Sequence, residues 1–202
     1  MTPLPPHGSL RRRSVLRALG VAASRLLLPG VWVAAAAGSA AVRAAEAELT
    51  VLEVGRDEDG VFLTYAVDFE LGKAADEALT KSVPLFFVAQ TEIFRDRWYW
   101  RDRRVADAQR VFKVVLQPLT STYRLTTTGG LSQTYPIRAE ALAAISRATR
   151  WKVAEAGQLE DGHHYLEFNF RLDTTLLPRP MQIGISGQPD WQLSVKRTLR
   201  IN

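Results

Sequence analysis

The sequence contains no cysteine. A chain without cysteine has no disulfide bond, no thiolate metal site and no cysteine nucleophile, whichever compartment it occupies. The stability of its fold therefore has to come from a hydrophobic core. The chain has 202 residues, and a single domain of about 150 residues buries roughly two-thirds of its unfolded surface, so a core without disulfides is sufficient.

Histidine, a frequent general base and metal ligand, is scarce, with three residues in the whole chain. His7 lies near the amino terminus, whereas His163 and His164 are adjacent. Consecutive side chains of a strand point to opposite faces, so these two would not readily bind one metal ion. Asp161-Gly162 predicts a turn before them, and we interpret the pair as a polar entry into a strand.

Motifs of common enzyme classes are also missing. The chain has no phosphate-binding loop and no dinucleotide-binding glycine pattern. Gly184-Ile185-Ser186-Gly187 places its second glycine one residue too early for a serine-hydrolase elbow. Neighbouring carboxylates such as Asp57 and Asp59, or Glu160 and Asp161, fall in predicted turns. We therefore predict a non-catalytic protein without catalytic, cofactor-binding or metal-binding residues, and a hydrolase with carboxylates on distant strands is the remaining enzymatic alternative.

Acidic residues are absent from the first 45 positions, which contain six arginines. A basic start at Arg11 to Arg17 precedes a largely apolar stretch at 26–42, and small residues follow. This is the layout of an export signal, with cleavage after Ala44 or Ala47. We predict an export signal at residues 1–45, and an uncleaved inner-membrane anchor is the alternative.

The export route and the charge balance both depend on this leader. Arg12-Arg13 resembles a twin-arginine signal, although Arg11 and Val15 depart from that pattern. After the leader, 20 basic residues face 21 acidic ones. A near-neutral domain has no overall field that would attract nucleic acid or an anionic membrane. We predict a periplasmic protein that does not bind nucleic acid.

Residues 46–202 are predicted to form a single β-rich domain, because apolar residues recur at every second position in several stretches. Residues 74–82 and 139–150 instead have helical composition or spacing. We predict an antiparallel, immunoglobulin-like β-sandwich of about seven to nine strands with two short helices, and a small β-barrel is the alternative. The predicted strands are 49–54, 61–71, 85–100, 105–116, 122–128, 166–172 and 191–201.

The most unusual segment runs from Phe94 to Arg104, with five arginines, two aspartates and four aromatic residues. Arginine and large aromatic residues dominate binding hot spots. A simpler interpretation is a long strand end with Trp98 and Trp100 packed in the core and Arg–Asp pairs on the wet face. Asp96 and Asp102 favour this simpler interpretation because they partly neutralise the arginines. The candidate partner-binding residues are Arg95, Arg97, Tyr99, Arg101, Arg103 and Arg104.

Two stretches carry a family resemblance, namely Asp96 to Trp100 and Leu177-Pro178-Arg179-Pro180 followed by residues 187–191 (Gly-Gln-Pro-Asp-Trp). Together with Pro84 to Val88 and Ser146 to Lys152, they resemble the proteobacterial family numbered 4390 among domains of unknown function. The resemblance implies an exported protein, often encoded beside a membrane sensor histidine kinase, and carries over no catalytic residue. The prolines of the Leu-Pro-Arg-Pro stretch predict a stiff extended connector.

These observations predict a binding module for a protein partner at the inner membrane, for which a sensor kinase is the candidate that the resemblance implies. A carrier of a small apolar ligand is the alternative. A sizeable apolar cavity would favour the carrier, and a filled core with an exposed arginine or aromatic surface would favour partner binding.

Overall fold

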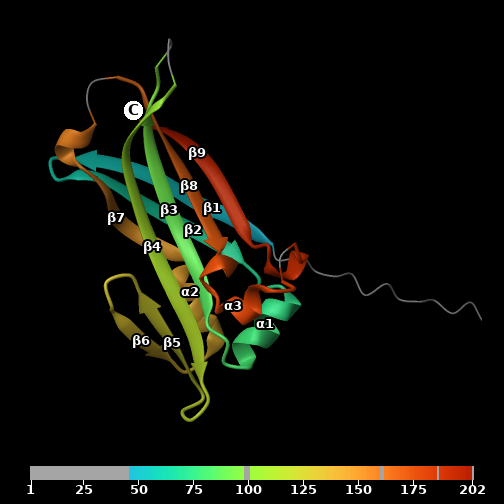
Figure 1. Ribbon diagram of the computed structural model, residues 1–202. Helices are drawn as coiled ribbons and strands as arrows, with labels where there is room; N and C mark the ends of the chain where they lie inside the picture. Colours follow the sequence, from blue (N-terminus) through green and yellow to red (C-terminus); the bar gives the residue numbers. More distant parts are fainter. Residues whose placement is uncertain (1–45, 98–100, 160–161, 186, 202) are drawn as a thin grey trace, which may run out of the picture. The chain divides into compact units, whose positions relative to one another are not determined.

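The computed structural model describes residues 46–97, 101–159, 162–185 and 187–201, all within one compact unit, Ala41–Asn202 (Figure 1). The predicted export signal lies outside the described residues, as do Trp98, Tyr99 and Trp100. Within the described ranges, the chain forms nine strands in two antiparallel sheets of three and six strands. The predicted β-sandwich is confirmed. Both sheets are open at their edges, so the alternative of a closed barrel is wrong.

The smaller sheet has the strand order β1-β2-β7. Its first two strands form the predicted hairpin, in which the Asp57 carboxylate accepts a hydrogen bond from the Asp59 backbone N–H at 3.0 Å. Gly60 closes this turn with a φ of 144°, a backbone conformation that favours glycine. The carboxylates here have the turn role that their positions predict. The strands are β1 (Ala47–Asp57), β2 (Gly60–Phe69) and β7 (Arg147–Glu155).

The larger sheet has the order β6-β5-β4-β3-β8-β9. The pairing of β3 with β8 joins segments that are 69 to 85 residues apart in sequence, with Phe87 opposite Leu172 and Arg95 opposite His164. β3 and β4 form a long hairpin. The strands are β3 (Leu85–Arg95), β4 (Arg103–Gln117), β5 (Thr122–Thr127), β6 (Ser132–Tyr135), β8 (His164–Leu172) and β9 (Ser194–Ile201).

The core lies between the two sheets and follows from the predicted alternation. On β2, the side chains at every second position from Val61 to Val67 are buried, and on β8 the same holds from Leu166 to Leu172. Tyr65 packs against Phe168 with ring centroids 4.8 Å apart. Large aromatic side chains bury the most apolar area per residue, so this contact between the sheets is a main source of stability.

Three helices surround the sheets in the described part of the chain, and none of them is long and apolar enough to cross a membrane. The two predicted helices exist, but the second ends at Ile145, whereas the sequence pattern predicted it to reach Arg150. Residues from Arg147 onward form β7 because they pair with β2, and this tertiary pairing overrides local helical spacing. The helices are α1 (Lys73–Thr80), α2 (Arg138–Ile145) and α3 (Arg179–Gln182).

The last part of the chain departs from its prediction in two places. Pro180 lies in the first turn of α3, a position where proline's fixed φ suits a helix, so the predicted extended connector is wrong. The final strand begins at Ser194, because Trp191 ends a short 3₁₀ turn, η3 (Pro189–Trp191). Trp191 is buried, whereas Val195 is only half-buried on an edge strand. Two further 3₁₀ turns are η1 (Ala156–Gln158) and η2 (Thr174–Leu176).

Candidate binding site at the end of the β3–β4 hairpin

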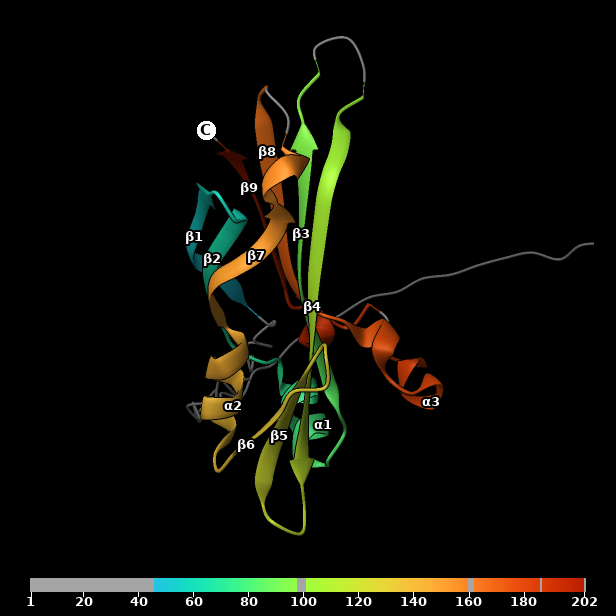
Figure 2. The ribbon, with the colours of Figure 1, turned by 90° about the vertical axis from the view of Figure 1, so that its left-hand side faces the viewer.

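The candidate arginines belong to the end of the β3–β4 hairpin, which extends past the start of β8 (Figures 1 and 2). β3 ends at Arg95 and β4 begins at Arg103. Arg95 is half-buried, and the other candidate arginines in the described part of the hairpin are exposed. The structure therefore brings together Arg95, Arg97, Arg101, Arg103 and Arg104, while Tyr99 lies outside the described residues.

Strand pairing divides these arginines between two faces. Arg103 lies opposite Arg95, so two guanidinium side chains face each other, and Arg95 in turn lies opposite His164, which extends the row across β4, β3 and β8. Like charges directly opposite each other in a sheet are destabilising. This row is on the face that packs against the smaller sheet, and it concentrates basic groups at one end of the domain.

The opposite face of the hairpin carries an ion pair, but its acid is a glutamate and not one of the aspartates of the segment. The Arg104 guanidinium lies 2.7 Å from the Glu92 carboxylate, and this pairing raises the pKa of Arg104. Asp102 is also occupied, because one carboxylate oxygen accepts the Tyr165 hydroxyl at 2.7 Å and the other accepts the Arg97 backbone N–H at 3.3 Å. Arg104 and Asp102 thus have structural roles.

Arg97, Arg101 and Arg103 differ from Arg104 in having no ion-pair partner among the described residues. Their exposed guanidinium groups keep five N–H donors each in a rigid fork that matches a carboxylate or a phosphate. This arrangement can bind an acidic group but offers no general base or nucleophile.

The pKa of Tyr165 depends on the hydrogen bond that joins β8 to Asp102 of the hairpin. Its hydroxyl donates to Asp102, and this hydrogen bond, with burial and nearby carboxylates, raises the tyrosine pKa to about 12. We expect Asp102→Asn to lower this pKa toward the ordinary value near 10, because the negative charge that opposes ionisation is removed. A spectrophotometric or NMR titration of Tyr165 measures the shift.

Asp107→Asn is the matched control for this titration. It removes an exposed carboxylate from β4 that does not contribute to the raised pKa of Tyr165. Its tyrosine should titrate as in the wild type. An unchanged pKa in Asp102→Asn would mean that Asp102 does not hold the hairpin in solution.

A pocket of about 310 Å³ lies where β3 ends and β8 begins, lined by Asp96, His163, His164, Tyr165, Arg200 and Ile201. The adjacent histidines point to opposite faces as predicted, since His163 is exposed and His164 is 5% exposed. Sequence reasoning treated both as a polar strand entry and missed the burial of His164. The available signal was its position two residues before Leu166, which places it on the apolar face of the strand.

A larger cleft of about 750 Å³ lies where β2 ends beside α1 and α2. Apolar residues such as Phe69 and Leu142 line it, together with Asp68, Arg147 and the ion-paired side chains of Asp76 and Arg138. The cleft is thus lined by charges of both signs. It has the size of a ligand site without the mainly apolar lining of a lipid carrier.

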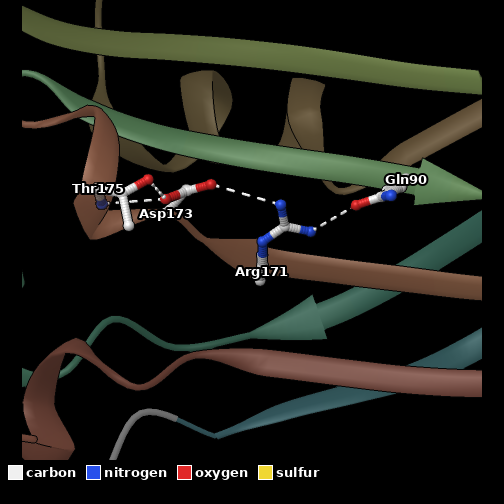
Figure 3. A network of polar contacts seen from close by, with 4 residues as sticks. All are labelled: Gln90, Arg171, Asp173 and Thr175. Atoms are coloured by element: carbon white, nitrogen blue, oxygen red, sulfur yellow. Dashed lines mark hydrogen bonds and ion pairs between the residues drawn. The ribbon is translucent and has the colours of Figure 1, made fainter.

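Four polar residues on the outer face of the larger sheet contact one another in a network (Figure 3). Arg171 donates to Gln90 at 3.0 Å and pairs with Asp173 at 3.4 Å. Asp173 also accepts the backbone N–H and the hydroxyl of Thr175 at 3.0 and 2.6 Å. These bonds fix the entry into η2, so the network has a structural role. Across the described ranges, no group of three or more potential ligands is placed to hold a metal ion.

Residues 44–201 match the family described as a domain of unknown function, DUF4390. The chain belongs to this family. The DUF4390 match spans all nine strands described above, so the family domain includes both sheets and the hairpin, and the resemblance inferred from the sequence is confirmed at the level of the family. No curated protein and no solved structure matches the chain.

Proposed function

We propose that this DUF4390 domain is a non-catalytic, periplasmic protein-binding module whose β3–β4 hairpin holds an acidic segment of its partner. The observation that carries the proposal is the set of exposed guanidinium groups of Arg97, Arg101 and Arg103, for which the described residues provide no carboxylate. Arginine at the centre of an interface is a common hot spot because it makes several directed hydrogen bonds.

The charge balance supports a local recognition surface. The chain after the leader is nearly neutral, with 20 basic and 21 acidic residues, so it has no general attraction for polyanions. A cluster of arginines in such a domain gives attraction at one place only. This favours docking of a specific acidic protein segment over non-specific binding of nucleic acid.

The proposed location and partner rest on the sequence. The leader has the pattern of an export signal, and the family resemblance implies a connection with a membrane sensor kinase. We therefore place the partner at the inner membrane. The carrier alternative has less support, because the space between the sheets is filled by side chains and the larger cleft is lined in part by charged residues.

The test is a double substitution at the hairpin. We expect Arg101→Ala/Arg103→Ala to reduce partner capture by about 30-fold, since losing interface arginines costs about 2 kcal/mol or more. The melting temperature should stay nearly unchanged, because both side chains are exposed. Crosslinking in living cells followed by quantitative mass spectrometry measures the capture.

The control removes the same charge elsewhere, with Arg179→Ala/Arg197→Ala, two exposed arginines on α3 and β9. This variant should capture the same partners as the wild type. If the hairpin variant retains its partners, or if both variants lose them equally, the hairpin is not the binding surface and the proposal fails.

A further inference from the structure

His164 has an unusual environment for a polar side chain. It is the first residue of β8 and is 5% exposed, on the same face as Leu166 and Phe168. Its Nδ1 lies 3.0 Å from the Gly162 carbonyl oxygen. A carbonyl can only accept a hydrogen bond, so Nδ1 carries the hydrogen, and Nε2 of the neutral ring is an acceptor.

That acceptor has no donor in the described part of the chain. Buried polar atoms are nearly always hydrogen-bonded, because losing water without a replacement partner costs free energy. His164 lines the pocket of about 310 Å³ where β3 ends and β8 begins. A pocket at the lower end of the range for ligand sites can take one side chain or a few water molecules.

The rim of this pocket has charges of opposite sign. Asp96 lies on one part of the wall and Arg200 on another. The position of Asp96 is set by its backbone N–H, which donates to the His163 carbonyl at 2.9 Å and extends the pairing of β3 with β8. Ile201, Tyr165 and His163 also line the pocket.

Nε2 of His164, Asp96 and Arg200 together determine which kind of chemical group can bind in the pocket. An ionised carboxylate or phosphate brings no hydrogen for Nε2 and would be repelled by Asp96. A cation would be repelled by Arg200. Within the described ranges, the two histidines and Asp96 do not form a group that could hold a metal ion. A neutral hydrogen-bond donor satisfies Nε2 and lies between the rim charges at no electrostatic cost.

We propose that this pocket is a subsite for a neutral hydroxyl or amide side chain of the bound partner segment, with Nε2 of His164 as its acceptor. This inference rests on the proposed function, in which the hairpin binds an acidic segment. Asp96 lines the pocket and is followed directly by Arg97, so a segment that reaches the Arg97 guanidinium passes the pocket mouth. The partner motif would therefore combine acidic residues with one serine, threonine, tyrosine, asparagine or glutamine.

The experiment uses a displayed library of random peptides selected on the purified protein. The enriched peptides should share acidic positions and one hydroxyl or amide position. For a synthetic copy of an enriched peptide, replacing that residue with alanine should weaken binding at least about tenfold, as expected for one buried hydrogen bond. The same replacement should have no further effect in His164→Phe, because a double-mutant cycle isolates the pair.

Thr134→Phe is the control variant, since Thr134 is exposed on β6 and lies outside the pocket lining, and it should keep the full effect of the alanine replacement. If His164→Phe does not fold, the ¹⁵N resonance of Nε2 in the wild type gives the answer, because it should shift with the enriched peptide and not with its alanine version. An unshifted resonance, or acidic peptides without a shared hydroxyl or amide, would mean that water alone fills the pocket and would overturn the inference.

The failure of the proposed function would look different. Peptides that depend on His164 but bind equally well to Arg101→Ala/Arg103→Ala would contradict the arginine surface and leave the pocket in place. A selection that enriches no peptide would overturn both.

Discussion

Phe168→Ala is expected to lower the free energy of unfolding by about 3–5 kcal/mol, the usual cost of removing a buried phenylalanine. Phe168 is fully buried on β8, and its ring packs against Tyr65 of the facing sheet at 4.8 Å. The substitution removes the apolar contact between the sheets and leaves a cavity that the surrounding strands cannot close. Denaturant unfolding followed by circular dichroism measures the loss.

The matched control is Phe62→Ala. Phe62 lies on β2 with its ring under the Arg150 guanidinium, 4.3 Å from the ring centroid, and it is half-buried. Its loss should cost about 1 kcal/mol, because an exposed cation–π contact and partial burial are worth little. Equal destabilisation by the two substitutions would mean that the sheets do not pack through Phe168.

Gly60→Ala should destabilise the domain by about 2–4 kcal/mol for two separate reasons. The φ of 144° at Gly60 is a conformation that side chains other than glycine rarely adopt, which alone costs about 1–3 kcal/mol. A Cβ at this position would also lie 2.3 Å from the Ala154 carbonyl oxygen on β7. Relieving that clash requires movement of the backbone, in addition to the strain.

Gly55→Ala provides the comparison. A Cβ at Gly55 meets no atom within 4 Å, and this residue is in the same hairpin, on β1. Alanine there should leave stability unchanged or raise it slightly, because it reduces the freedom of the unfolded chain. The two midpoints of urea unfolding should therefore differ clearly. Coincident midpoints would show that β2 and β7 are not paired at this end.

The parts of the fold that could be predicted were those encoded in adjacent residues. The alternation from Val61 to Val67 assigned a strand and its buried face without any partner. The turn at Asp57 to Gly60 was equally local, because carboxylate and glycine chemistry determine it. By contrast, the segment after Ile145 has helical spacing but forms a strand, because its secondary structure depends on hydrogen bonds to β2.

The candidate site divides in the same way. Composition alone pointed to the arginine-rich segment between Phe94 and Arg104. Only the tertiary contacts show which polar side chains of the segment have structural roles. Arg104 forms an ion pair with Glu92 across the hairpin. Asp102 accepts a hydrogen bond from the hydroxyl of Tyr165, about 60 residues away in sequence. No local pattern could indicate those partners.

The sequence by itself thus determined the family, through its motifs. It also determined that the domain is mainly β and which faces of the main strands are buried, because side-chain alternation and turn chemistry act over a few residues. The tertiary structure decided which strands are neighbours and what each side chain meets across the sheet. The pairing of β3 with β8 places His164 beside Arg95, near the turn of the β3–β4 hairpin. That placement depends on backbone hydrogen bonds between distant segments, and it is the reason why a histidine at a strand entry becomes a buried acceptor in a pocket.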